Sequence, residues 1–206
     1  MKIAPGEFVR TVKKLTYRDY AAMPEEEGVR YQIFDGVLTL KEGTGSLHQI
    51  VIGELICQIG NALLESKFRY LSGPLDVRFA QPGEPFDEAT TVLQPDFLVY
   101  LDFHQCVEVG GNGCPDFVIE VLSRGGAKND FGRKRDIYEA FGAKEYWIID
   151  ATHRVLFVHA RSGNLFAAVQ IYEFDTLLPV NSVPGLSIDL VQLARTLDRA
   201  ERLIDA

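Results

Sequence analysis

The stretch CPDFVIEVLS, from Cys114 to Ser123, places a glutamate inside a run that otherwise has the composition of a buried β-strand. Burying a lone carboxylate is costly unless it is paired, protonated or bound to a metal ion. Glu120 therefore limits the folds open to this chain, because the fold has to bring a partner for this carboxylate from elsewhere in the sequence.

A second run, QPDFLVYL, also carries Pro-Asp at the mouth of an apolar strand. Its candidate acid is Asp96, and that of the first run is either Asp116 or Glu120. Side chains opposite one another on paired strands have Cβ atoms about 4.5–5.5 Å apart, so Asp96 and Glu120 can share one hard cation. Mg²⁺ prefers one or two carboxylates together with water and phosphate oxygens. The pair predicts a Mg²⁺ site, which Mn²⁺ can also occupy, for hydrolysis at phosphorus.

Each acid also has a structural interpretation. Asp96 after Pro95 is a common turn arrangement. Glu120 could face water on an edge strand, or an arginine could neutralise it.

A basic cluster follows the second run directly and comprises Arg124, Lys128, Arg133, Lys134 and Arg135. Asp130, Lys134 and Tyr138 recur at i, i+4 and i+8, which places them near one face of a helix. We expect Lys134 to assist the attacking water, although a surface ion pair with Asp130 explains the same spacing.

The other basic residues of the cluster are candidates for substrate contact. We expect Arg133 and Arg135 to hold neighbouring phosphates. Lys128 is the rival of Lys134 for the catalytic role and otherwise a further phosphate contact. His48, near the start of a predicted helix, either packs that helix or contacts substrate.

The order of elements predicts a mixed α/β or α+β fold in which helices flank a mixed β-sheet. A helix capped by Thr16, a hairpin at Asp35-Gly36 and a long helix from Ser46 to about Leu64 come first. A helix is expected from Asn129 or Asp130 to about Phe141, with Gly142 as its stop. The predicted strands are FRYLSG, LDVRFA, PDFLVYL, DFVIEVLS, KEYWIID, RVLFVHA and FAAVQIYEF, and a last helix covers about Leu190 to Ile204.

The composition is that of an ordinary globular protein, and residues 1–206 are expected to form a single domain. A net charge of −8 argues against a protein that coats nucleic acid non-specifically, because phosphate binding rests on clustered Lys and Arg. There is no run of signal-peptide or membrane-span character, and three cysteines without a CxxC pair fit free thiols. We therefore expect a cytoplasmic protein.

Two other motifs carry little functional weight. His104, Cys106 and Cys114 supply three zinc-type ligands without a clear fourth. The GGNG segment at 110–113 lacks the Lys-Ser/Thr ending of a P-loop, and we interpret it as a flexible turn.

Together, PDFLVYL, PDFVIEVLS, the D-x-x-x-K-x-x-x-Y spacing and GAKEYWIID resemble the Uma-two family of restriction endonucleases, a branch of the PD-(D/E)XK nuclease superfamily. YQIFDG and SLHQI are similar to the family's N-terminal signature, with Asp35 and His48 at family positions. The resemblance implies a restriction-endonuclease-like core and Mg²⁺-dependent hydrolysis of DNA phosphodiester bonds. It also implies that Asp96 and Glu120 are metal ligands and that Lys134 is the catalytic lysine.

Two positions depart from the pattern. The usual lysine two residues beyond the glutamate is Leu122, so the catalytic lysine has moved to the helix or is missing. Gln32 stands where the family usually has Glu. These departures favour the alternative of a catalytically inactive nuclease fold that binds nucleic acid or protein. A third alternative is a small-molecule binder in which Glu120 recognises an amine. Cleavage of both strands of a duplex would suit a homodimer.

Overall fold

A seven-stranded mixed sheet forms the centre of the protein. The structure is a computed structural model that describes residues 13–24, 27–41, 43–123 and 125–204. The strand order is β12-β11-β10-β9-β6-β3, with β13 also paired to β11. The strands are β3 (Arg69–Ser72), β6 (Phe97–Tyr100), β9 (Phe117–Val121), β10 (Glu145–Asp150), β11 (Val155–Ser162), β12 (Leu165–Phe166) and β13 (Gln170–Glu173). The parallel pair β9–β10 lies at its centre, and the pairing of β6 with β9 is antiparallel.

A smaller six-stranded sheet has the order β2-β1-β5-β4-β8-β7. Its strands are β1 (Tyr31–Phe34), β2 (Val37–Leu40), β4 (Val77–Arg78), β5 (Val92–Leu93), β7 (Cys106–Val107) and β8 (Gly110–Asn112). A separate hairpin pairs β14 (Leu177–Pro179) with β15 (Ser187–Asp189).

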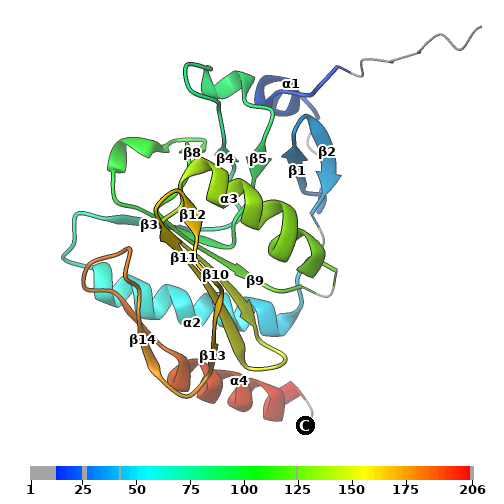
Figure 1. The fold of residues 1–206 in the computed structure, drawn as a ribbon. Helices are drawn as coiled ribbons and strands as arrows, with labels where there is room; N and C mark the ends of the chain where they lie inside the picture. Colours follow the sequence, from blue (N-terminus) through cyan, green and yellow to red (C-terminus); the bar gives the residue numbers. More distant parts are fainter. Residues whose placement is uncertain (1–12, 25–26, 42, 124, 205–206) are drawn as a thin grey trace, which may run out of the picture.

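Helices lie on both faces of the central sheet, and one short helix lies beside the small sheet (Figure 1). They are α1 (Tyr17–Ala21), α2 (Ser46–Leu63), α3 (Arg135–Phe141) and α4 (Leu190–Ile204), with 3₁₀ turns η1 (Phe86–Glu88) and η2 (Phe103–Gln105) and the π-helical segment η3 (Asn129–Lys134). No helix in the described part of the chain combines the length and apolar character needed to cross a bilayer.

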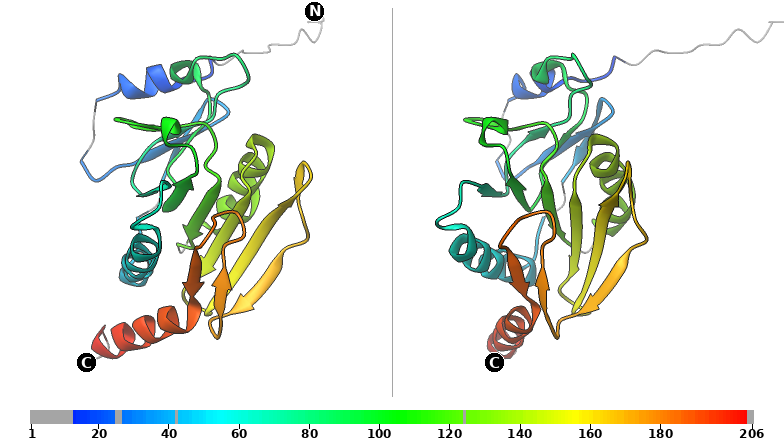
Figure 2. Two further views of the ribbon diagram at one scale, coloured as in Figure 1. Left: turned by 90° about the vertical axis from the view of Figure 1, so that its left-hand side faces the viewer. Right: turned by 60° about the vertical axis from the view of Figure 1, so that its left-hand side comes forward.

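Two hydrophobic clusters define the layers of the molecule. One joins α2 and α4 to one face of the central sheet through residues such as Leu55, Leu193 and Trp147. The other joins the opposite face to the small sheet and α3, with Tyr138 in its core. Figure 2 shows α2 and α4 on one side and the small sheet on the other. Neighbouring residues along β6 and β9 therefore point alternately into the two clusters.

Most predicted elements are present. Thr16 caps α1 with a capping box, and Asp35 and Gly36 have the positive φ angles of a tight hairpin turn. The helix predicted from Ser46 ends at Leu63, one residue before the expected end, and α4 has its expected bounds. Gly142 ends α3 in the left-handed conformation, as expected.

Three expectations need correction. The GGNG segment is not a flexible turn, because Gly110–Asn112 forms β8. Its glycines permit close approach of the backbone, since a Cβ on Gly111 would overlap the Tyr100 hydroxyl. FAAVQIYEF is two strands rather than one, because β12 pairs with the end of β11 and β13 with its beginning.

The helix expected from Asn129 or Asp130 to Phe141 begins instead as a π-helix, η3, that continues into α3. Gly132 lies inside η3, and glycine is a weak α-helix former. Asp130 is not a cap, because its buried carboxylate contacts Lys134. Segments of π-helix are found frequently at functional sites, which directs attention to the side chains of η3.

Candidate active site

Asp96 and Glu120 lie opposite one another on neighbouring strands. The antiparallel register pairs Phe97 with Ile119, so the next opposed pair is Asp96, directly before β6, and Glu120 inside β9. Alternation along each strand places both on the face that the small sheet and η3–α3 cover, because Leu98 and Val118 belong to that cluster. The two carboxylates therefore share one face of the sheet.

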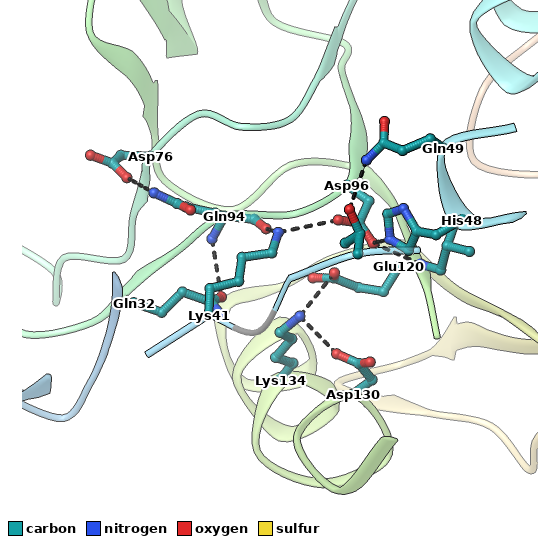
Figure 3. A network of polar contacts seen from close by, with 12 residues as sticks. Gln32, Lys41, His48, Gln49, Asp76, Gln94, Asp96, Glu120, Asp130 and Lys134 are labelled. Carbon is teal, nitrogen blue, oxygen red and sulfur yellow. Dashed lines mark hydrogen bonds and ion pairs between the residues drawn. The ribbon is translucent and has the colours of Figure 1, made fainter. Parts of the chain in front are cut away.

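The Asp96 carboxylate is held by three other segments of the chain (Figure 3). Its Oδ1 lies 3.1 Å from Nζ of Lys41, which also donates to the Gln94 carbonyl at 2.6 Å. Its Oδ2 lies 3.0 Å from Nε2 of His48 and accepts a hydrogen bond of 2.9 Å from the Val121 N–H. Asp96 is therefore fixed against β9, the strand that carries Glu120.

The Glu120 carboxylate is held by the helical segment that begins with η3. Nζ of Lys134 lies 2.9 Å from Glu120 Oε2 and 2.7 Å from Asp130 Oδ1, and the Tyr138 hydroxyl donates to Glu120 Oε1 at 3.1 Å. Figure 3 shows Lys134 between the two carboxylates. The lysine side chain is 6% exposed and that of Glu120 is 1% exposed, so water screens this ion pair poorly.

The charges of the site determine its protonation. Burial raises the pKa of Glu120 to about 7, with Asp96 and Asp130 adding to the rise and Lys134 opposing it. Burial also raises the pKa of Asp130. Although burial alone would raise the pKa of Asp96, the His48 hydrogen bond and the charge of Lys41 bring it well below its usual range. Three carboxylates thus face two lysine ammonium groups, and the site is short of positive charge.

Lys134 itself stays protonated. Burial would lower the pKa of its ammonium group, but Glu120 and Asp130 outweigh burial and raise that pKa. Lys134 can therefore donate hydrogen bonds and stabilise negative charge, and it is poorly suited to accept a proton.

A cavity of about 160 Å³, which we call the carboxylate cavity, opens beside these groups. Its lining includes the three acids, Lys41, Lys134, His48, Gln32, Thr44, Asn129 and the glycines Gly125 and Gly126. Gln32 is buried, and its side-chain oxygen accepts from the Gln94 N–H at 3.2 Å. An uncharged amide thus borders the cavity at the position where we noted a departure from the family pattern.

The other predicted substrate contacts lie outside this lining. Arg133 is exposed, with its guanidinium 5.3 Å from the centre of the Phe34 ring, and Lys128 is exposed as well. Arg135 contacts Glu139 at 2.7 Å, and that ion pair engages its guanidinium. His48 is the predicted substrate contact that borders the cavity.

Asp116, the alternative acid of the second strand, is elsewhere. Its Oδ2 accepts from the Leu101 N–H at 2.8 Å, and its Oδ1 lies 2.9 Å from Nζ of Lys144. These contacts join β6 and β9 at their far ends. Of the two Pro-Asp acids, only Asp96 borders the carboxylate cavity. The turn residue Asp35 likewise lies outside the cavity lining, in the β1–β2 hairpin.

Sequence reasoning missed Lys41. The residue directly follows β2, and its side chain is 13% exposed. The Asp35-Gly36 hairpin signal fixes the register that places Lys41 opposite Arg30, but the approach of this hairpin to Asp96 depends on the pairing of β1 with β5, which no local pattern indicates.

The site supplies hard oxygen donors but few of them. Within the described ranges, no group of three or more His, Cys, Asp and Glu side chains is placed to hold a metal ion. Two opposed carboxylates with a deficit of positive charge nevertheless suit Mg²⁺, which commonly keeps several waters and uses substrate phosphate oxygens as further ligands.

Comparison with protein families identifies the class of protein as restriction-endonuclease-like. The sequence model of the Uma2 family, described as "Putative restriction endonuclease", matches residues 17–191. The chain therefore belongs to the Uma2 family, as its motifs indicated.

Among the solved structures that match is one with the same fold. It is described as a "putative nuclease belonging to DUF820" from Anabaena variabilis, and it superposes with a TM-score of 0.70 at 19% sequence identity. The match covers 89% of this chain and 99% of the other, and at this identity it establishes the fold alone. No curated protein matches the chain.

Proposed function

We propose that this protein is a Mg²⁺-dependent endonuclease of the PD-(D/E)XK type that hydrolyses phosphodiester bonds of DNA. Membership of the Uma2 family supports nuclease chemistry. The observation that carries the proposal is the pair of carboxylates, Asp96 and Glu120, opposed on one face of the sheet with Lys134 at 2.9 Å from the second.

In this proposal Asp96 and Glu120 hold the cation, and Mn²⁺ can replace Mg²⁺. A bound divalent ion supplies charge neutralisation and lowers the pKa of water for attack on phosphorus. The ordered hydrogen bonds to Asp96 from His48 and the Val121 N–H keep one carboxylate ionised and oriented. The fixed orientation limits the reorganisation that binding would require.

Lys134 acts as the catalytic lysine in its protonated form. Its ammonium group borders the carboxylate cavity, where it can donate to the attacking water or to a non-bridging phosphate oxygen. We assign the exposed Arg133 and Lys128 and the half-buried Arg135 to outlying phosphates of the DNA, and His48 to substrate beside the cavity. A two-fold dimer would present one such site to each strand of a duplex.

Neutral variants of the two acids test this assignment. Asp96→Asn and Glu120→Gln should abolish Mg²⁺- or Mn²⁺-dependent nicking of plasmid DNA while circular dichroism shows that both variants stay folded. Asp116→Asn is the matched control, because this acid has the same Pro-Asp setting and contacts Lys144 outside the cavity. It should retain activity. Full activity in either site variant would refute the assignment.

The second candidate function is a catalytically inactive nuclease fold that binds nucleic acid or protein. The contacts favour it in one respect, because Lys41, Lys134, His48 and Tyr138 already engage the oxygens of both carboxylates. Titration calorimetry separates the two proposals. The nuclease binds Mn²⁺ and loses that binding in Asp96→Asn, whereas an inactive fold shows no Mn²⁺ heat that depends on Asp96.

A further inference from the structure

A second cavity, of about 290 Å³, adjoins the carboxylate cavity. The two share Lys41, Thr44, His48 and Asp96 in their linings. The second cavity is also lined by Arg30, Gly43, Gln49, Ile52, Gly28, Gly73 and Pro74. We call it the Arg30 cavity. Its one acid, among the described residues, is Asp96 in the shared wall.

The Arg30 cavity holds two basic side chains directly opposite each other. The Lys41 N–H donates to the Arg30 carbonyl at 2.7 Å, which extends the β1–β2 register of Tyr31 with Leu40 by one pair. Opposed residues of an antiparallel pair point to the same face, and like charges there are unfavourable. An anion between Arg30 and Lys41 would relieve that repulsion.

The guanidinium of Arg30 is available for such an anion. Lys41 contacts Asp96 and the Gln94 carbonyl, but Arg30 is exposed and its side chain makes no ion pair or hydrogen bond with the other described residues. Arginine is suited to bidentate contact with phosphate. The bottom of the cavity thus has a compensated cation, and its rim has an uncompensated one.

The N-terminus of α2 adds to the positive potential. Thr44, His48 and Gln49 line the cavity around the first turn of this 18-residue helix. Its N-cap is Gly45, which offers no side-chain cap, and the first turn contains no acid. Helix N-termini favour anions through their free N–H groups and the helix dipole. The Nδ1 atom of the buried His48 also has no hydrogen-bond partner in the described structure.

We propose that the Arg30 cavity is a phosphate subsite that binds the phosphate next to the scissile one on the same DNA strand. The inference rests on the proposed nuclease function for the identity of the ligand. Lys41 stands in the wall between the cavities, so it faces both phosphates, whereas Arg30 contacts only the neighbouring one. Arg30 is therefore a residue for substrate positioning outside the reacting centre.

Binding without metal tests the subsite separately from catalysis. The Kd of a fluorescently labelled single-stranded DNA oligonucleotide is measured in EDTA over a series of salt concentrations for wild type, Arg30→Gln and Arg30→Lys. Loss of one phosphate contact to a single strand should reduce the slope of log K against log salt by about 0.7. Arg30→Lys should keep most of the slope. Arg199→Gln, on the exposed side of α4, is the charge-matched control and should behave as wild type.

Kinetics in Mg²⁺ then test whether Arg30 contacts the neighbouring phosphate rather than the scissile one. Arg30→Gln should raise KM for the oligonucleotide several-fold and leave the hydrolysis of bis(p-nitrophenyl) phosphate, which has no neighbouring phosphate, unchanged. An unchanged salt slope in Arg30→Gln would overturn the subsite. An equal loss of kcat/KM on the oligonucleotide and on bis(p-nitrophenyl) phosphate would overturn it as well. If Arg30→Gln shows the reduced salt slope but the wild type cleaves neither substrate, the nuclease proposal fails while the phosphate subsite stands.

Discussion

Replacement of Lys134 by methionine tests the electrostatic account of the site. The substitution keeps an unbranched side chain of similar length and removes the ammonium group that lies 2.9 Å from Glu120 and 2.7 Å from Asp130. Removing one partner of a buried ion pair costs about 3–5 kcal/mol, because a charge is left buried without compensation. Since one ammonium serves two carboxylates here, we expect a loss of about 4–5 kcal/mol in the free energy of unfolding at pH 8.

The cost should depend on pH in a defined direction. Lys134 lowers the pKa of Glu120, which burial already raises to about 7 in the wild type. Without the lysine this pKa rises further, so the folded variant binds more protons than the folded wild type between pH 6 and pH 8. The difference in stability should therefore shrink by roughly 1 kcal/mol as the pH falls from 8 to 6.

The free energy of unfolding is measured by urea denaturation. Circular dichroism and the fluorescence of Trp147, the single tryptophan of the chain, monitor the transition. Lys144→Met is the matched control. Its ammonium lies 2.9 Å from Asp116, but the lysine side chain is 52% exposed, and ion pairs at the surface contribute about 0–1 kcal/mol. If Lys134→Met costs no more than Lys144→Met at pH 8, or if its cost grows as the pH falls, the buried carboxylates do not depend on Lys134 as described.

Three further predictions each concern a single residue. The pKa of Glu120 is raised in the folded protein, so protonation of this group should stabilise the metal-free protein as the pH falls from 8 to 5. The melting temperature of the wild type should therefore rise over this range, and Glu120→Gln should flatten its dependence on pH. If the melting temperature of the variant depends on pH as steeply as that of the wild type, groups other than Glu120 cause the dependence. Gly111→Ala should cost about 1–3 kcal/mol in urea unfolding because its Cβ would overlap the Tyr100 hydroxyl. Gly53→Ala, in an open position on α2, should instead stabilise the protein by up to about 1 kcal/mol, and a destabilised Gly53→Ala would contradict the helix argument.

The acid pair of the site could be predicted because the constraint is strong and simple. A glutamate within the buried β9 needs a partner, and the repeated Pro-Asp signal indicated that Asp96 shares its setting. The exact register, with Asp96 one position beyond the Phe97–Ile119 pair, could not be derived. It depends on which strands pair, and that is a property of the whole sheet.

The short strands of the small sheet were harder to predict, because they are two to four residues long and their pairing comes from distant parts of the chain. β4 pairs with β8 across more than thirty positions of sequence, and β8 consists of Gly110, Gly111 and Asn112. Glycine and asparagine are typical of turns, so local composition argued for the wrong state. Close packing against Tyr100 overrides that preference.

The two lysines of the site differ in how well the sequence predicts them. Lys134 beside Glu120 could be predicted, whereas Lys41 beside Asp96 could not. One continuous helical segment carries Asp130, Lys134 and Tyr138, which are spaced four residues apart. Lys134 contacts one carboxylate oxygen of Glu120 and Tyr138 contacts the other. Asp130 contacts the same ammonium group of Lys134. Helical periodicity is local, so this grouping could be predicted even though η3 is π-helical. Lys41 reaches Asp96 from a position 55 residues earlier, through the pairing of β1 with β5. A charge contributed by tertiary structure alone has no signature in the spacing of residues. Only the fold reveals that Lys41 contacts Asp96, while Lys134 is shared by Glu120 and Asp130.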